Sequence, residues 1–342
     1  MAVMHPWEKQ FNKHKEENVL QRHIPEAARQ GEEEVKRQAM VIVRPLVGLI
    51  LIAGVIALFA PTFRSWAAIS NVFENASVLF IMCTGMTVAL IGGCLDLSVG
   101  STYALVSVVV GQLLMAHVSV PLAILGGLAA GGVCGAVNGL IVTGTGIPPL
   151  IATLGTQLMF RGVANMIGAA SNMSAFPSSF DILGSGFWGP MINCVIAFVI
   201  VWFFLTRTKT GFHAFAIGGN EEVARLAGIP VKRDKILFYV ICGLMAALAG
   251  IVYTARVDMA QVNRGVGMEL WAIAGVVIGG TSAFGGVGNV VTTVIGVLII
   301  SVLQAGMIHL HVQAFMQQVA VGAVIVLAVW LDFWQRRRTA RG

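Results

Sequence analysis

Charged residues are scarce in this chain of 342 residues. Only 11% of the residues are Asp, Glu, Lys or Arg, whereas 57% are hydrophobic and the mean hydropathy is +0.83. Soluble domains carry about 25% charged residues, so this composition excludes a soluble protein. It predicts an integral membrane protein. The 40 glycines agree with this class, because small residues let membrane helices approach one another closely.

Several motifs of soluble chemistry are also missing. No G-x-x-x-x-G-K-[ST] phosphate loop occurs, so the chain does not bind ATP by that route. The cysteines lie singly in apolar runs without C-x-x-C spacing, which is typical of small buried hydrophobic residues rather than of disulfides or a metal site. They are Cys83, Cys94, Cys134, Cys194 and Cys242. Histidines and acids do not cluster as a membrane enzyme would need, and we expect no metal or cofactor in this chain.

Basic side chains are concentrated in three parts of the chain. Eight of the 22 Lys and Arg lie in residues 1–44, six lie in residues 206–235 and four lie from Arg336 onward. This clustering is typical of the positive-inside bias of membrane proteins and not of a nucleic-acid-binding patch, although the net charge is +6. We therefore expect the 206–235 loop and the basic tail to lie on the cytoplasmic side.

Ten apolar blocks follow the polar N-terminal segment. Their ranges are 45–60, 76–93, 102–116, 121–143, 148–170, 190–205, 236–255, 270–284, 289–307 and 315–334. Several are shorter than the ~20 residues that a membrane-spanning helix needs, which indicates broken or re-entrant helices. The predicted fold is an all-α polytopic membrane protein with about ten transmembrane helices. Because ten is even, both termini are expected in the cytoplasm.

The predicted organisation has three parts: a polar extension over residues 1–44, a transmembrane domain over 45–335 and a basic tail over 336–342. The extension, with a helix expected over 24–38, is either a solvated cytoplasmic arm or a regulatory segment that binds a partner. The longest external loop, 171–189, is aromatic and almost uncharged. It suits either a docking surface for an external partner or an interfacial connector with an aromatic anchor.

A helix of about two turns is predicted inside the 206–235 loop. Asn220 can cap its N-terminus, two acidic residues follow in the first turn, and Gly228 before Pro230 ends it. So short a helix is marginal in water and should dock against something. The residues assigned to this docking helix are Asn220, Glu221, Glu222, Arg225, Leu226 and Gly228.

One apolar block carries polar side chains at a spacing of four residues. Thr153, Gln157, Arg161 and Asn165 form a slanted stripe, with each residue offset by about 40° from the last. Arginine at the centre of a membrane helix costs about 2.5–3.5 kcal/mol and should face protein or water. The stripe suits a polyol that exchanges hydrogen bonds as it passes. Alternatively, Arg161 lies near the outer interface and extends its head to water.

Two glycine-rich segments predict breaks in the membrane helices. The first, IGGCLDLSVGS from position 91, contains Asp96, which either caps the next helix or lies on a transport path. The second, IGGTSAFGGVGN from position 278, shares the leading Ile-Gly-Gly, which hints at an internal repeat.

Four segments together resemble the permease subunits of bacterial ATP-driven importers of ribose, arabinose, xylose and galactose. The segments are GGCLDLSVGS (92–101), VNGLIVTGTGIPPLIATLGT (137–156), TGFHAFAIGGNEEVARLAGIPV (210–231) and GVGMELWAIAGVVIGGTSAFGGVGN (265–289). They occur in the family's order, and with Arg161-Gly162 the likeness covers the chain from about residue 45. Cys94, Leu95 and Ala283 depart from the residues usual in the family, and the long N-terminal extension is unusual for it.

The resemblance implies a multi-pass inner-membrane subunit that pairs with itself or a close relative. A periplasmic sugar-binding protein would deliver a pentose or hexose, and a separate cytoplasmic ATPase with ATP and Mg would drive import through the docking helix. This chain would then be no enzyme. The sugar and the choice between homodimer and heterodimer stay open. The alternative is an ion-coupled secondary transporter of a small polar solute that uses Asp96. The expected path residues are Asp96, Ser98, Asn138, Thr153, Gln157, Arg161 and Asn165.

Overall fold

The computed structural model describes residues 43, 45–168 and 173–339 of the chain. The chain divides into two units, Met1–Val47 and Gly48–Gly342, and the second contains every site discussed below. The N-terminal extension with its predicted helix over 24–38 lies outside the described residues, apart from position 43.

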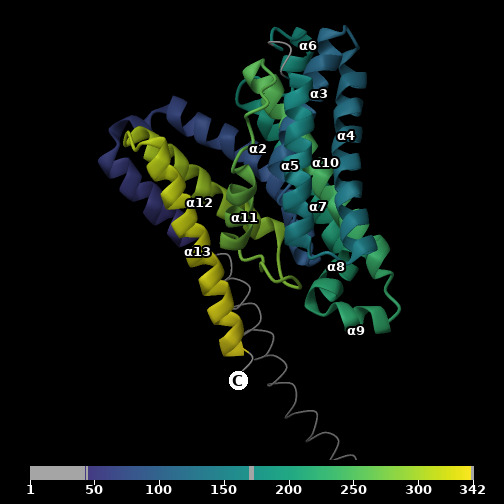
Figure 1. Ribbon diagram of the computed structural model, residues 1–342. Coiled ribbons are helices and arrows are strands. Elements are labelled where there is room, and N and C mark those ends of the chain that lie inside the picture. Colours follow the sequence, from purple (N-terminus) through teal and green to yellow (C-terminus); the bar gives the residue numbers. More distant parts are fainter. Residues whose placement is uncertain (1–42, 44, 169–172, 340–342) are drawn as a thin grey trace, which may run out of the picture. The chain divides into compact units, whose positions relative to one another are not determined.

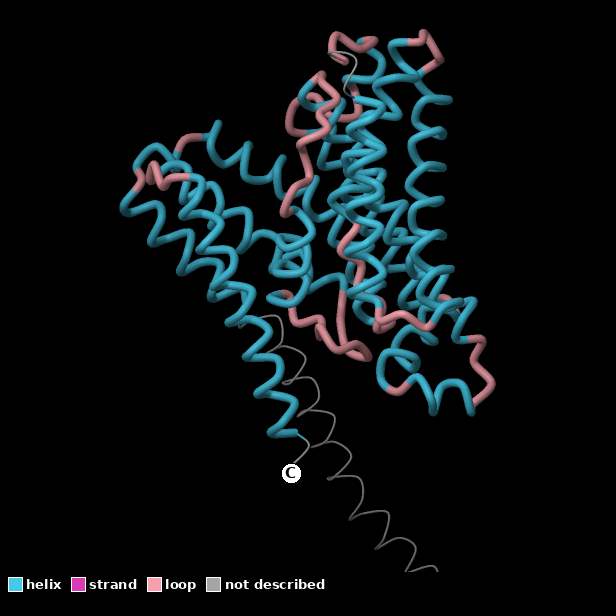
Figure 2. The backbone as a smooth tube through the Cα atoms, viewed as in Figure 1, coloured by secondary structure: helices cyan, strands magenta, loops and turns pink. Residues whose placement is uncertain are grey.

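The described residues form helices joined by loops, and none of them forms a strand (Figures 1 and 2). Each of the ten predicted apolar blocks contains one helix. These helices are Pro45–Phe59, α2 (Trp66–Ile91), α3 (Val99–Met115), α4 (Val120–Thr145), α5 (Pro149–Gly168), α7 (Trp188–Arg207), α10 (Val231–Val257), α11 (Met268–Ile278), α12 (Val290–His309) and α13 (Ala314–Thr339). The shorter helices are η1 (Pro61–Arg64), α6 (Ser178–Asp181), α8 (Lys209–Gly219) and α9 (Glu221–Leu226). The prediction of an all-α membrane protein is confirmed.

Five of the described helices, α2, α4, α7, α10 and α12, are long and apolar enough to cross a membrane. By contrast, α11 has 11 residues. At 1.5 Å per residue it extends about 16 Å, roughly half of the hydrocarbon core of a bilayer. A glycine turn follows it and leads into α12, so the α11–α12 segment bends within the protein.

The centre of the fold is α10, which packs against α2, α3 and α4. Helix α4 meets α10 through buried glycines four residues apart: Gly127, Gly131, Gly135 and Gly139. A side chain at Gly131 would come within 2.6 Å of the Gly243 carbonyl oxygen in α10. Small residues at this spacing let the backbones of two membrane helices touch. In lipid, where the hydrophobic effect does not drive helices together, such close packing stabilises their association.

The predicted likeness between the two Ile-Gly-Gly segments extends to the backbone. Gly93 after α2 and Gly280 after α11 both adopt positive φ, +68° and +88°. In each turn the next residue donates its N–H to a carbonyl five residues back, Cys94 to Ala89 at 2.8 Å and Thr281 to Val276 at 3.2 Å. This is the hydrogen-bond pattern of a glycine-terminated helix.

Several predicted boundaries are wrong. Helix α2 begins at Trp66 rather than at residue 76, and α10 begins at Val231 rather than at 236. Both helices run past their apolar blocks, because hydropathy marks the part in lipid and not the helix end. The loop 206–235 also contains α8, which was not predicted.

Two of the four aromatic side chains in the connector over 171–189 are buried, and Phe187 is half-buried. Phe176 is 8% exposed and Phe180 is fully buried, whereas Trp188 is 70% exposed. Side chains packed in the core cannot meet an external protein, so the described residues 173–189 favour the interfacial connector over the docking surface. Four of the cysteines are buried and Cys194 is half-buried, all with free thiols, as expected for small hydrophobic residues.

Candidate functional site

Asp96 lies at the centre of a buried polar cluster between α2 and α3. Its Oδ1 accepts hydrogen bonds from the Ser98 backbone N–H at 2.8 Å and the Ser98 hydroxyl at 2.7 Å. The Asn138 amide of α4 donates to both carboxylate oxygens, at 3.1 and 3.2 Å, and Thr156 of α5 donates to the Asn138 Oδ1 at 2.6 Å. Asp96 is 1% exposed. The carboxylate therefore holds the turn before α3, whose N-cap residue is Ser98, and links the start of α3 to α4 and α5.

Three members of the predicted stripe on α5 face the protein. Thr153 is buried and donates to the Pro149 carbonyl at 2.8 Å. Gln157 donates to Glu269 Oε1 of α11 at 2.9 Å. The other oxygen of Glu269 has no hydrogen-bond partner among the described residues. An amide-to-carboxylate hydrogen bond thus joins α5 and α11.

The Arg161 guanidinium binds backbone rather than open space. It donates to the carbonyls of Val262 at 2.6 Å, Arg264 at 2.8 Å and Gly100 at 3.2 Å. Three charge-assisted bonds to carbonyls hold the loop between α10 and α11 against α3. Arg161 is half-buried, and its guanidinium ties α5 to this loop and to α3.

Asn165 is separated from the other three stripe residues. It is exposed on α5. Successive stripe residues rotate by about 40°, so Asn165 is turned by about 120° from Thr153 and cannot share its face. The stripe therefore does not form one continuous polar track in this structure.

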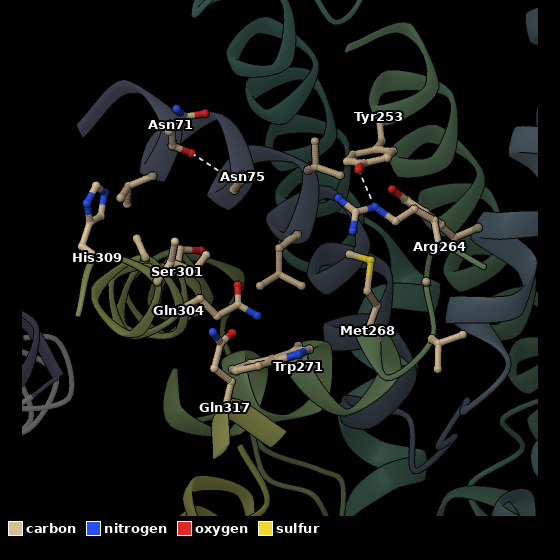
Figure 3. A pocket seen from close by; sticks show the side chains of 18 of the residues that line it. Asn71, Asn75, Tyr253, Arg264, Met268, Trp271, Ser301, Gln304, His309 and Gln317 are labelled. Atoms are coloured by element: carbon tan, nitrogen blue, oxygen red, sulfur yellow. Dashed lines mark hydrogen bonds between the residues drawn. The ribbon is translucent and has the colours of Figure 1, made fainter. Parts of the chain in front are cut away.

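A cavity of about 550 Å³ lies elsewhere. It is bounded by the first turns of α2, the loop before α11, the C-terminal half of α12 and the start of α13 (Figure 3). Its polar and aromatic lining residues are Asn71, Asn75, Tyr103, Tyr253, Asn263, Arg264, Trp271, Ser301, Gln304, His309 and Gln317. None of the seven predicted path residues lines it.

The chemistry of this cavity suits a neutral, hydroxyl-rich solute. The Gln304 and Gln317 amides extend toward one another beside the Trp271 ring (Figure 3). Amides donate and accept hydrogen bonds, and an indole offers a flat apolar face. The buried Ser301 Oγ has no hydrogen-bond partner among the described residues, so a bound hydroxyl could supply one. No Asp or Glu is among the described lining residues.

The one arginine in the cavity wall is held by a tyrosine. The Arg264 Nε donates to the Tyr253 hydroxyl, and the guanidinium lies 4.8 Å from the centre of the Tyr253 ring (Figure 3). Tyr253 in turn packs on Tyr103, with ring centres 5.8 Å apart. Because Arg161 binds the carbonyl of Arg264, the loop that carries this cation is fixed from both sides.

Sequence reasoning missed this cavity because its wall comes from segments far apart in the chain. Two local signals were available. Asn71 and Asn75 are spaced by four residues in the first turns of α2, and Arg264 is one of the few basic residues outside the three basic clusters. Among the described residues, no group of three His, Cys, Asp or Glu could hold a metal ion.

The docking helix has the predicted local structure. Helix α9 covers Glu221–Leu226, the Asn220 side chain accepts the Val223 N–H at 3.0 Å, and Gly228 has φ +82°. Ala224 faces inward, whereas Val223 is 59% and Leu226 is 82% exposed. Glu222 pairs with Arg225 at 3.8 Å, and Lys235 of α10 binds Glu221 at 2.5 Å. An apolar surface framed by charges is therefore displayed on this helix.

The end of α8, directly before α9, touches two other backbones. A side chain at Gly218 would lie 2.5 Å from the Gly286 nitrogen and 3.0 Å from the Ile91 carbonyl carbon. Gly286 also donates its N–H to the Ile91 carbonyl at 2.9 Å. We call Gly218, Ile91 and Gly286 the glycine junction. It joins α8, the C-terminus of α2 and the turn that leads into α12.

Comparison with known proteins identifies the family. Residues 68–329 match the model described as branched-chain amino acid transport system / permease component. The ribose import permease protein of Bacillus subtilis (strain 168) is 39% identical over 294 residues, 84% of this chain and 91% of the relative. The D-allose transport system permease protein of Escherichia coli (strain K12) is 38% identical over 293 residues, 82% of this chain and 89% of the relative.

A third relative is the galactose/methyl galactoside import permease protein of Haemophilus influenzae, which is 33% identical over 307 residues, 83% of this chain and 91% of the relative. No solved structure matches the chain. The resemblance inferred from four short segments is confirmed over most of the chain. This multi-pass inner-membrane chain belongs to the permease family of sugar ABC importers.

Proposed function

We propose that this chain is the transmembrane subunit of an ATP-driven importer and carries a pentose or hexose through the cavity beside Trp271. Three relatives are named as permeases for ribose, allose and galactose. The observation that carries the proposal is the cavity wall, which combines an indole, neutral amides and an unpartnered buried hydroxyl, Ser301. Sugars offer hydroxyls for the amides and an apolar face for the ring.

In this proposal the chain crosses the membrane ten times with both termini in the cytoplasm. The basic clusters support that orientation. Helices α8 and α9 lie at the end of the described helices opposite to α6 (Figure 1). Asn71 near the N-terminus of α2 and Gln304 near the C-terminus of α12 line the cavity, and the other ends of α2 and α12 lie at the glycine junction. The cavity would then belong to the outer half of the protein.

Coupling to a separate ATPase would enter through α9. The exposed Val223 and Leu226 supply an apolar contact, and the charges of Glu222 and Arg225 frame it. Movement of α9 would reach the cavity through the glycine junction, because α2 and α12 each connect that junction to the cavity wall. The ATPase can shift the equilibrium between the outward-open and inward-open permease only if it contacts α9 differently in its two nucleotide states.

Other partners follow the same model. A periplasmic sugar-binding protein would deliver the sugar, and a second permease copy or a close relative would complete the pore. Asp96, Ser98 and Asn138 then act as the rigid frame of the path, and Thr153 and Gln157 line its continuation between α5 and α11. Asn165, exposed on α5, falls outside this path.

The test compares Gln304→Leu with Asn165→Leu in vesicles that contain the ATPase and the sugar-binding protein. Both variants replace an amide with an apolar side chain of similar size. We expect Gln304→Leu to reduce sugar uptake about tenfold, since one or two hydrogen bonds to the sugar are worth ~1 kcal/mol each. Asn165→Leu should transport normally. If Asn165→Leu lowers uptake and Gln304→Leu does not, the sugar path follows the α5 stripe instead of this cavity. Uptake that is driven by a Na⁺ or H⁺ gradient without ATP would contradict the importer model.

A further inference from the structure

A second cavity of about 510 Å³ lies on the opposite side of the first turns of α2. Ten of its eleven lining residues are apolar, and the exception is Arg64. They are Leu49, Ala53, Gly54, Ala57, Phe63, Arg64, Ile69, Val72, Phe73, Leu298 and Val302. We call this the Arg64 groove. It lies between the helix Pro45–Phe59, η1, α2 and α12, and it contains nothing that would recognise a polar solute except the arginine.

Two residues place one end of the Arg64 groove at a membrane–water interface. Arg64 is exposed, and its Nε donates to the Ala57 carbonyl at 2.6 Å, which fixes the base of the guanidinium. None of the described acidic side chains forms an ion pair with it. Trp66, two residues on, is 74% exposed. Exposed tryptophan and arginine at a helix end are typical of the headgroup level of a bilayer.

We propose that the Arg64 groove binds one anionic phospholipid, with an acyl chain against the apolar wall and the phosphate on Arg64. An exposed guanidinium without an acidic partner is complementary to a phosphate, which it binds through paired N–H groups. The apolar wall begins directly below that cation and runs along a helix that lies in the membrane.

A second copy of this chain fits the groove less well than a lipid. A twofold contact centred on the Arg64 groove would bring the same surface of both copies together, so two unpaired arginines would face one another. Burial of two like charges without acids is unfavourable, whereas a lipid phosphate neutralises the charge. The observations therefore favour lipid.

The position of the groove gives the lipid a consequence for transport. Val72 lines both cavities, and Asn71 and Asn75 on one side of this segment face the sugar cavity while Ile69 and Phe73 line the groove. A lipid in the groove would support the outer wall of the sugar cavity from behind. This consequence rests on the proposed function, whereas lipid binding itself does not.

The test counts bound lipids by native mass spectrometry on the purified full chain, titrated with phosphatidylglycerol or with zwitterionic phosphatidylcholine. Gly54 lines the groove, and a side chain there would meet nothing within 4 Å, so Gly54→Leu fills the space without a clash. Gly48→Leu is the matched control, because Gly48 is in the same helix, is equally unobstructed and does not line the groove.

We expect the wild type and Gly48→Leu to retain one phosphatidylglycerol in preference to phosphatidylcholine, and Gly54→Leu to lose it. Arg64→Gln should bind it about fivefold more weakly, as one charge near anionic lipid is worth ~1 kcal/mol. Arg64→Lys keeps the charge but not the paired N–H groups and should fall in between. Equal lipid retention in Gly54→Leu and Gly48→Leu would overturn the proposal. Loss of a dimer in Gly54→Leu with unchanged lipid would assign the groove to a second copy. Both readouts are independent of sugar uptake.

Discussion

After α2 and after α11 the chain makes the same glycine turn, and before the next helix an acidic or amide side chain accepts the backbone N–H of the second residue after it. Asp96 accepts the N–H of Ser98 before α3 at 2.8 Å, and Asn289 accepts the N–H of Val291 before α12, also at 2.8 Å. The first of these two side chains is a buried acid in contact with Asn138 of α4. The other is an exposed amide.

The second turn has backbone contacts with itself and with α8, and the Phe284 N–H also donates to the Ser282 Oγ at 3.2 Å. The Ser282 N–H donates to the Val287 carbonyl at 2.9 Å, and side chains at Gly285 or Gly286 would come within 3.0 Å of the backbone of α8. The first turn is thus fixed by side chains inside the membrane domain. The second lies against the segment that leads to the docking helix. The comparison indicates that the first turn is part of the frame, whereas motion from the cytoplasm enters at the second.

The largest effect is expected when the buried acid Asp96 is removed. Asp96→Ala leaves the Ser98 hydroxyl and backbone N–H without their acceptor, while the Asn138 amide keeps only the Ser98 Oγ at 2.7 Å. Each unsatisfied buried group costs about 1–3 kcal/mol. Asn289→Ala removes an exposed cap, worth ~1 kcal/mol. The midpoint of thermal aggregation in detergent should therefore fall much further for Asp96→Ala. Similar midpoints for the two variants would remove the distinction between the turns.

A smaller effect should follow from Arg161, which ties Gly100 near the first turn to the loop that carries Arg264. Arg161→Leu takes the donors from three carbonyls and should raise the sugar concentration for half-maximal uptake about tenfold, because a hydrogen bond from a charged group is worth ~1.5–3 kcal/mol. Arg161→Lys keeps the charge without the planar fork and should fall in between. A lowered maximal rate at unchanged sugar dependence would argue against a positioning role.

The smallest effect on stability is expected at the second turn. Gly280 and Gly285 both have positive φ, +88° and +90°, so alanine costs about 1–2 kcal/mol at either position. A side chain at Gly280 meets nothing within 4 Å, whereas one at Gly285 would lie 2.8 Å from the Gly218 carbonyl oxygen. Gly285→Ala alone should lower the sugar imported per ATP hydrolysed. An equal loss of sugar imported per ATP in Gly280→Ala and Gly285→Ala would show that backbone strain, and not contact with α8, causes the effect.

Much of this fold could be predicted from local patterns. The ten apolar blocks locate ten helices, and Asn220 with Gly228 defines α9, because helix periodicity and capping depend on neighbouring residues. The two glycine-rich segments also correctly indicated breaks, since α2 ends at Ile91 and α11 ends at Ile278. Helix ends were less accurate, since α2 and α10 extend beyond lipid into polar sequence.

The site was predicted less well. Asp96, Ser98 and Asn138 do come together, but no pattern links Gln304 to Asn71, which lie in different helices and meet only through tertiary packing. Of the predicted stripe on α5, Thr153, Gln157 and Arg161 contact other parts of the protein, whereas Asn165 is exposed. The role of Gly218 depends on two backbones remote in sequence, so composition alone marked it only as one glycine among 40.

The most direct measurement of the coupling model compares Gly218→Ala with Gly219→Ala in the reconstituted importer. A side chain at Gly218 meets the backbones of Ile91 and Gly286, whereas one at the adjacent Gly219 meets nothing within 4 Å. Sugar uptake and ATP hydrolysis are measured together. We predict that Gly218→Ala hydrolyses ATP but imports several-fold less sugar per ATP, while Gly219→Ala behaves as the wild type. Normal uptake per ATP in Gly218→Ala would contradict the claim that the glycine junction carries motion to the cavity.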